Sequence, residues 1–273
     1  MPFRSHVARS LDLRLPSNLI LVALILGAGS LALVLWLNGA SGTLLWAPFH
    51  AFLAWGLIRE IDPDHQWSAV VGALGAAGWV LAGGQLASAA AIGGLLLAGR
   101  IVVRSTGRRP LLTDLIVIGV FGVAMGYTIE GWMAGFGLAI AIHVDGSLDR
   151  DTTTPNTVTA ALTAIGVTVV AAVFDAFPQP PLEFAPVPAT VIGLAALMVT
   201  LRDPAEPVSV VDARHGALID GDRLHRARSL TAVLIFVTTM LAGEGATAFL
   251  PLALIVALVI VSNELELLGR RGR

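Results

Sequence analysis

Residues 55–67 read WGLIREIDPDHQW and join two apolar segments, at residues 43–58 and 65–82. Neither apolar segment contains Asp, Glu, Lys or Arg, whereas residues 59–64 hold four charged side chains. Pro63 and its polar neighbours favour a turn, because proline interrupts a helix. The pattern predicts two helices joined by a short charged turn at a membrane surface. The clustered charges also make this turn a candidate functional site.

The composition indicates a membrane protein. Of the 273 residues, 56% are hydrophobic and 13% are charged, and the mean hydropathy is +0.81. Soluble domains contain about 45–50% apolar and about 25% charged residues. Because apolar segments use up nearly the whole length, we expect an all-α, polytopic integral membrane protein with a single transmembrane domain, residues 1–273.

Composition also narrows the chemistry and the source. Cysteine is absent, which excludes disulfides, thiolate metal ligands and thiol nucleophiles. The net charge of −2 gives no indication of nucleic-acid binding. All 17 basic residues are arginine, which we interpret as the codon usage of a GC-rich prokaryotic genome. We therefore expect the plasma membrane of a prokaryote.

Arginine positions support a particular number of spans, because cytoplasmic loops of membrane proteins are enriched in Lys and Arg. If the N-terminus is cytoplasmic, ten spans place all 17 arginines on the cytoplasmic side. The sequence therefore predicts about ten transmembrane helices with both termini in the cytoplasm. The predicted spans are residues 19–37, 43–58, 65–82, 86–103, 111–129, 131–144, 158–174, 187–201, 230–243 and 246–263.

Prolines recur just before the outward-going spans. Pro16, Pro63, Pro110 and Pro155 are separated by 47, 47 and 45 residues, and proline suits the first turn of a helix. This period predicts five helical hairpins. Internal duplication and the ordinary length of two short spans both explain it.

The third hairpin, residues 111–144, is the shortest. It carries Gly122 and Gly126, then Gly131 and Gly135, on either side of its outer turn. Small residues four apart allow two membrane helices to approach closely. We expect these glycines to serve packing and not ligand binding.

The largest predicted extramembrane segment is a cytoplasmic loop, residues 202–229, inserted before the last hairpin. Arg223, Arg226 and Arg228 stand beside the following span, where each basic residue gains about 1 kcal/mol from anionic lipid. We expect anionic headgroups of the lipid bilayer to contact them. Recruitment of a protein partner by this loop is the alternative.

Few polar side chains fall within or beside the predicted spans. An ionisable group in a membrane is a functional hypothesis by default, because burying its charge is costly. A neutral histidine bonded to a neighbouring helix explains His50 equally well, and a carboxylate in the first helical turn explains Asp114. The candidate positions are His50, Asp114, Glu130 and His143.

The acids of the charged turn have two interpretations. Asp62 before Pro63 is typical of an N-cap, and Asp64 of a first-turn carboxylate. Alternatively, Asp62, Asp64 and His65 supply two carboxylates and an imidazole, which are ligands for a divalent metal. Apart from this candidate metal site, we expect no cofactor.

The functional hypotheses depend partly on missing motifs. The chain contains no Walker A loop, no G-x-S-x-G or H-E-x-x-H motif and no dinucleotide-binding fingerprint. We therefore expect a small permease-like protein that binds or moves a small solute or an ion between its hairpins. Two alternatives stay open: a membrane-embedded metal-dependent hydrolase or transferase with an acidic site on its cytoplasmic face, and a non-catalytic membrane subunit or scaffold.

Overall fold

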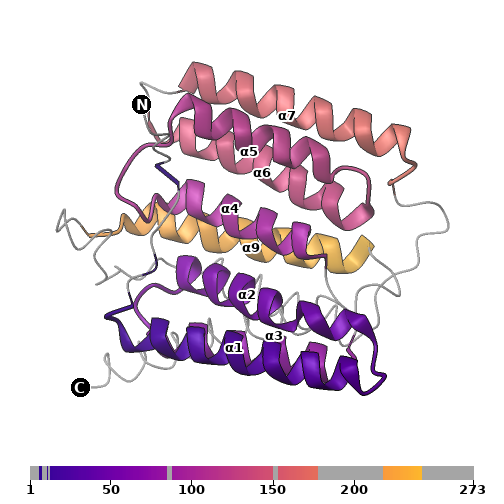
Figure 1. Cartoon of the computed structure of the whole chain (residues 1–273). Helices are drawn as coiled ribbons and strands as arrows, with labels where there is room; N and C mark the ends of the chain where they lie inside the picture. The colour runs from indigo at the N-terminus through magenta and orange to yellow at the C-terminus, as the bar shows by residue number, and fades with distance from the viewer. Residues whose placement is uncertain are drawn as a thin grey trace.

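The protein is helical in the parts that its computed structural model describes, which are residues 6–7, 11, 13–84, 88–149, 153–177 and 218–241 (Figure 1). Within these ranges the regular elements are eight α-helices and one short 3-10 helix, and no strand is formed. The spans predicted at 187–201 and 246–263, and most of the predicted loop, lie outside the described residues.

Every predicted span within the described ranges corresponds to a helix. The main differences are at the ends: a short 3-10 helix precedes α2, and α9 begins at Gly221 and not at residue 230. The basic stretch before the ninth predicted span is therefore helical and continuous with it. The elements are α1 Pro16–Leu37, η1 Gly42–Trp46, α2 Ala47–Ile61, α3 Gln66–Leu81, α4 Ala89–Val103, α5 Leu112–Met125, α6 Ile129–Ser147, α7 Thr153–Val173 and α9 Gly221–Leu241.

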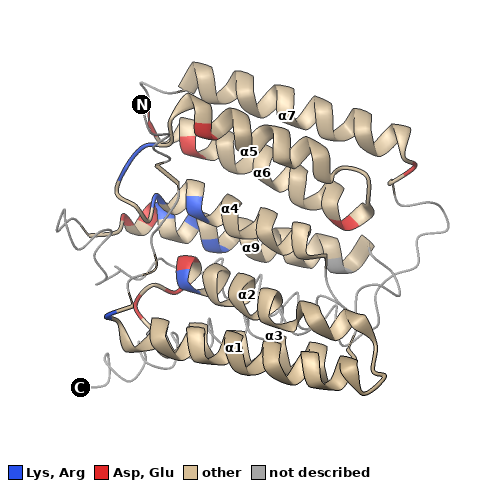
Figure 2. Cartoon of the chain, viewed as in Figure 1, with Lys and Arg blue, Asp and Glu red and all other residues tan. Residues whose placement is uncertain are grey.

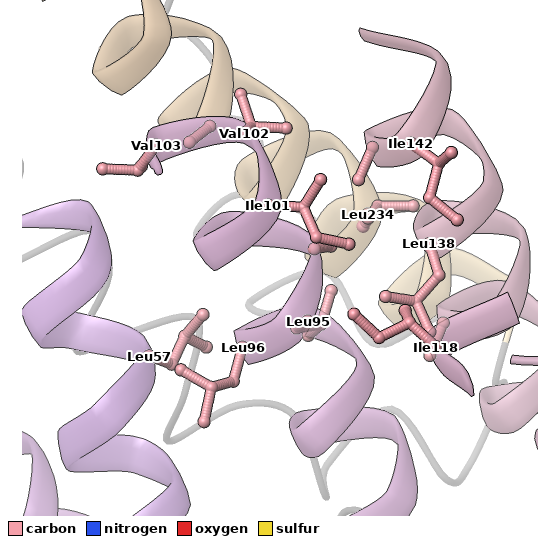
Figure 3. Close-up of a cluster of buried hydrophobic side chains, with 14 of the residues drawn as sticks. Leu57, Leu95, Leu96, Ile101, Val102, Val103, Ile118, Leu138, Ile142 and Leu234 are labelled. Atoms are coloured by element: carbon pink, nitrogen blue, oxygen red, sulfur yellow. The ribbon is translucent and has the colours of Figure 1, made fainter. Parts of the chain in front are cut away.

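The helices run side by side in a bundle with α4 and α9 in the middle (Figure 1). On one side α1, α2 and α3 pack against one another, and on the other side α5, α6 and α7 do the same. Helix α4 joins the two groups, because it contacts α2, α6 and α9. The largest cluster of buried apolar side chains surrounds α4 and includes Leu57, Leu95, Ile101, Leu138 and Leu234 (Figure 3).

The second predicted hairpin is not a closely packed pair. Helix α3 packs mainly against α2 and α1, whereas α4 packs against α2, α6 and α9. A Cβ atom added to Gly56 of α2 would lie 3.1 Å from the Leu96 side chain of α4. The missing side chain at Gly56 thus favours the approach of α4 to α2, which the order of the helices in the sequence does not predict.

The third predicted hairpin is closely packed, and the predicted packing role of its glycines is confirmed. A Cβ atom added to Gly135 of α6 would lie 2.5 Å from the carbonyl oxygen of Gly122 in α5. A Cβ atom added to Gly126 would lie 2.9 Å from the carbonyl oxygen of Val167 in α7. These contacts are with backbone atoms, so a larger residue has no flexible side chain to displace.

Two of the described helices, α1 and α7, are long and apolar enough to cross a membrane. Three shorter helices, Trp67–Leu81, Ala89–Val103 and Leu112–Met125, are also apolar. Many large apolar side chains on α1 and α7 are exposed, among them Leu26 at 65%, Leu162 at 65% and Val173 at 72%.

The charged residues of the bundle are distributed unevenly between its two ends (Figure 2). All described arginines lie near one end of the bundle, which we call the arginine-rich end. At this end the chain enters helices α1, α3, α5, α7 and α9 and leaves helices α2, α4 and α6. At the opposite end the described charges are acidic and stand at Glu130 and Asp175.

Candidate functional site

A pocket of about 150 Å³ lies between α1, α2 and α4 near the arginine-rich end. It is bounded by one face of α2, by part of α4 and by the residues that lead into α1. This combination of apolar walls and a few charged groups is typical of small-molecule sites. The lining residues are Leu11, Leu15, Asn18, Phe52, Trp55, Gly56, Arg59, Glu60, Leu96 and Arg100.

The α2 residues of the pocket share one helical face. Phe52, Trp55, Gly56, Arg59 and Glu60 follow one another at intervals of three and four residues. Such intervals place side chains above one another on a helix. The charged stretch at the end of α2 therefore turns two of its members, Arg59 and Glu60, toward the pocket.

Glu60 is the buried acid of the pocket. Its side chain is 2% exposed, and the Nε of Arg100 in α4 donates a hydrogen bond of 2.8 Å to its Oε1. Its Oε2 has no hydrogen-bond partner among the described residues. Nearly all buried polar atoms in proteins are hydrogen-bonded, so this oxygen requires an explanation.

Trp55 forms an aromatic wall beside Glu60. Its ring lies 6.3 Å from that of Phe52 at an interplanar angle of 26°, and the Arg59 guanidinium lies 5.4 Å from its centroid. Arg59 also donates a hydrogen bond of 3.3 Å to Ser17. The indole Nε1 of Trp55 is buried and, in the described part of the chain, has no acceptor.

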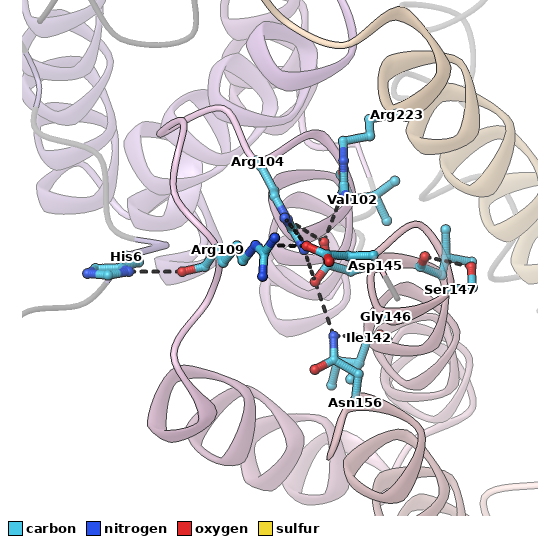
Figure 4. Close-up of polar contacts among 12 residues, drawn as sticks. His6, Val102, Arg104, Arg109, Ile142, Asp145, Gly146, Ser147, Asn156 and Arg223 are labelled. Carbon is cyan, nitrogen blue, oxygen red and sulfur yellow. Dashed lines mark hydrogen bonds and ion pairs between the residues drawn. The ribbon is translucent and has the colours of Figure 1, made fainter. Parts of the chain in front are cut away.

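A second buried ion cluster is centred on Asp145 of α6, which is 1% exposed (Figure 4). Its Oδ1 accepts from Arg104 Nε at 2.6 Å and from Arg223 Nη1 at 2.8 Å. Its Oδ2 accepts from Arg104 Nη2 at 3.0 Å and from Asn156 Nδ2 at 3.1 Å. Asp145 thereby links α6 to α7, to α9 and to the end of α4.

Arg104, a member of this cluster, has an uncommon backbone conformation. It follows the last residue of α4 with φ 52° and ψ 47°, the left-handed region that favours glycine. Its guanidinium donates two hydrogen bonds to the Asp145 carboxylate and one of 3.2 Å to Asp149. Burial lowers the pKa of Arg104, but the hydrogen bonds and charges of Asp145 and Asp149 outweigh it and raise the pKa above its ordinary value.

Asp114 anchors the chain before α1. Its Oδ2 accepts from the backbone N–H of Leu111 at 3.1 Å and from that of His6 at 2.9 Å. The Thr106 hydroxyl donates a hydrogen bond of 2.6 Å to the His6 carbonyl. The His6 ring donates one of 2.9 Å to the Arg109 carbonyl. This geometry matches a structural carboxylate at a helix start, and Asp114 does not line the pocket.

The other candidate polar residues of the spans do not line the pocket. His50 is buried in α2, and its Nδ1 donates a hydrogen bond of 3.0 Å to the carbonyl of Trp46. His143 is exposed on α6. Glu130, just before the predicted span 131–144, accepts a hydrogen bond of 3.0 Å from the Ser88 N–H. Burial raises the pKa of Glu130, and this hydrogen bond partly opposes the rise.

The predicted N-cap at Asp62 is wrong. Helix α2 ends at Ile61 and α3 begins at Gln66, so Asp62, Pro63 and Asp64 lie in the turn between them. The Asp62 carboxylate is instead engaged by His65, whose Nδ1 donates a hydrogen bond of 2.8 Å to Asp62 Oδ1.

Arg228 of α9 contacts this turn, because its Nε donates a hydrogen bond of 2.6 Å to the carbonyl of Ile61. Burial lowers the pKa of Arg228, and the charges of Asp62 and Asp64 partly restore it. Across the described residues, no group of three or more His, Asp or Glu side chains is arranged to hold a metal ion. In this turn His65 pairs with Asp62, and the charges of Asp62 and Asp64 act on Arg228.

The sequence does not identify the pocket residues as a site. In the sequence Arg59 and Glu60 stand out only as part of the charged turn, and Arg100 only as a cytoplasmic arginine. One signal is present: Leu96 and Arg100 are four residues apart, and residues 52, 55, 56, 59 and 60 share a helical period. That period does not say which neighbouring helix the face meets.

Comparisons with protein families, curated proteins and solved structures give no match. The function of the protein is therefore inferred from the geometry of the described residues.

Proposed function

We propose that the chain is a multi-pass protein of a prokaryotic plasma membrane, with ten crossings as five helical hairpins and both termini cytoplasmic. Two helices of spanning length and the exposed apolar side chains of α1 and α7 support a lipid surrounding. The gathering of the described arginines at one end of the bundle supports a cytoplasmic assignment of that end (Figure 2).

Within this protein, the pocket beside Glu60 is the site of a small solute, and the protein is permease-like. The observation that carries this proposal is that Glu60 lines the pocket while its buried Oε2 has no hydrogen-bond partner in the described part of the chain. A buried carboxylate oxygen of this kind is costly for folding alone. A bound solute with a hydrogen-bond donor removes that cost.

Transport in proteoliposomes tests the proposal. The purified full chain is compared with Glu60→Gln, and with Glu130→Gln as a matched change at the opposite end of the bundle. We expect flux of at least one solute from a panel of neutral, anionic, cationic and zwitterionic compounds. Glu60→Gln should reduce that flux about tenfold or more, as for one lost charge-assisted hydrogen bond. Absence of flux for the whole panel, or equal flux in wild type and Glu60→Gln, contradicts the proposal.

Lipid contact of the basic turn of α9 centres on Arg226. Arg223 is 8% exposed and bonded to Asp145, and Arg228 is bonded to Ile61, whereas Arg226 is exposed. Arg226→Gln should reduce the anionic lipid that copurifies with the protein, measured by native mass spectrometry. Retention equal to that of wild type contradicts a role for Arg226.

A further inference from the structure

Glu60 and Trp55 of the pocket wall have unmet hydrogen-bonding capacity of opposite kinds. Glu60, 2% exposed, presents an acceptor at Oε2, and Trp55, 7% exposed, presents a donor at Nε1. Neither atom has a partner within the described ranges. A ligand that fits both must offer a donor to Glu60 and an acceptor to Trp55. A hydroxyl group does both, because it carries one O–H donor and two lone pairs.

The charge of the pocket favours a neutral ligand. Glu60 already has a cationic partner, since Arg100 Nε lies 2.8 Å from its Oε1. The remaining charged lining residue, Arg59, donates to Ser17 and lies over the Trp55 ring. Bringing a further charge to this buried pair carries a desolvation cost that a neutral hydroxyl compound avoids.

The walls and the size restrict the ligand further. Phe52 and Trp55 stack beside each other, and Leu96 adds an apolar surface from α4, so C–H groups of a ligand have apolar contacts. The pocket volume of about 150 Å³ equals that of a cavity able to hold one benzene molecule, or about six non-hydrogen atoms.

We propose that this pocket binds a small neutral polyhydroxy compound of about glycerol size, whose hydroxyl groups bridge Glu60 Oε2 and Trp55 Nε1. The inference rests on the proposed solute-binding function and specifies its substrate class. The same chemistry has two sources, a free polyol in the cytoplasm and the glycerol headgroup of phosphatidylglycerol.

The test measures equilibrium binding of radiolabelled glycerol to the purified full chain in phosphatidylcholine nanodiscs. Unlabelled lactate, alanine and 1-amino-2-propanol compete as an anion, a zwitterion and a cation of similar size. We expect glycerol to bind and erythritol to compete, while the three charged compounds compete at least tenfold more weakly.

Two variants locate the binding. Trp55→Phe keeps the aromatic ring and removes the indole N–H, and Glu60→Gln keeps the size and removes the charged acceptor. Each should weaken glycerol binding about tenfold. Trp67→Phe, at a tryptophan that is 64% exposed and outside the pocket lining, should leave binding unchanged. Equal weakening by Trp67→Phe, or no weakening by the two pocket variants, overturns the assignment.

The outcomes separate this inference from the function on which it rests. If alanine, lactate or the amino alcohol binds and glycerol does not, the polyol class is wrong and a solute site remains. If no compound binds, both are wrong. A second nanodisc set containing phosphatidylglycerol distinguishes the sources. Glycerol binding equal to that in phosphatidylcholine supports a free polyol, and its loss supports hydroxyl recognition with the lipid headgroup as the ligand.

Discussion

Asp145 and Glu60 are buried carboxylates paired with arginine near the same end of the bundle, and they differ in what their second oxygen meets. Each of the two Asp145 oxygens accepts two hydrogen bonds, and the donors are side chains of α7, of α9 and at the end of α4. Glu60 uses one oxygen for Arg100, and the other has no partner among the described residues. We infer that the saturated cluster fixes the helices and that the unsaturated one, which lines a pocket, binds a ligand.

The largest expected effect is at the saturated cluster. Asp145→Asn leaves Arg104 and Arg223 without their shared buried carboxylate, and breaking a buried pair in this way costs about 3–5 kcal/mol. Unfolding in detergent, followed by circular dichroism, measures the loss. Asp222→Asn is the control, because Asp222 is exposed in the first turn of α9, where a carboxylate contributes about 0.3–1 kcal/mol. Equal losses from both variants would remove the structural role assigned to Asp145.

An intermediate effect on the free energy of unfolding is expected where an added methyl group meets backbone, and a smaller one where it meets a side chain of the pocket wall. Gly135→Ala drives a Cβ atom against the Gly122 carbonyl, and overpacking of this kind costs about 1–3 kcal/mol. Gly56→Ala meets only the Leu96 side chain, chiefly its methyl groups, which are the far end of a flexible side chain that borders the pocket. We expect Gly56→Ala to change the free energy of unfolding by less than about 1 kcal/mol. Chemical denaturation curves compare the two, and a larger loss for Gly56→Ala would contradict the contrast.

The smallest expected effect concerns a partly buried acid, Glu130, at the opposite end. Its pKa in the folded protein is raised by burial above the ordinary 4.5, so its ionised form is disfavoured by folding. Its charge therefore lowers stability at neutral pH, and the cost vanishes as pH falls below 4.5. Glu130→Gln should raise the midpoint of thermal unfolding slightly near neutral pH and have no effect in acid. A gain that persists in acid would show that burial of the charge is not its cause.

The helices were predictable from the sequence because long apolar segments separated by charged turns leave few alternatives. Boundaries were less predictable where tertiary contacts decide them. Helix α9 starts at Gly221 because Asp220 accepts from the N–H groups of Asp222 and Arg223, and Arg223 then reaches Asp145. The N-cap expected at Asp62 failed because its carboxylate pairs with His65.

The candidate site was predictable only in part. The sequence indicates that the end of α2 is unusual, and Glu60 of that end lines the pocket. It does not identify Arg100 as the partner, because this contact depends on α4 packing against α2 and not simply against its neighbour α3. His50, the most conspicuous histidine of the spans, bonds to the Trp46 carbonyl one turn away and lies outside the pocket lining.

The central claim is that Glu60 serves binding and not folding, and one paired measurement tests it. Solute flux and the free energy of unfolding are determined for wild type, Glu60→Gln and Asp145→Asn in the same preparations. We predict that Glu60→Gln loses flux about tenfold or more while its unfolding free energy falls less than that of Asp145→Asn, since Glu60 has one arginine partner where Asp145 has two. A loss of stability as large as that of Asp145→Asn, or flux equal to that of wild type, would contradict the account.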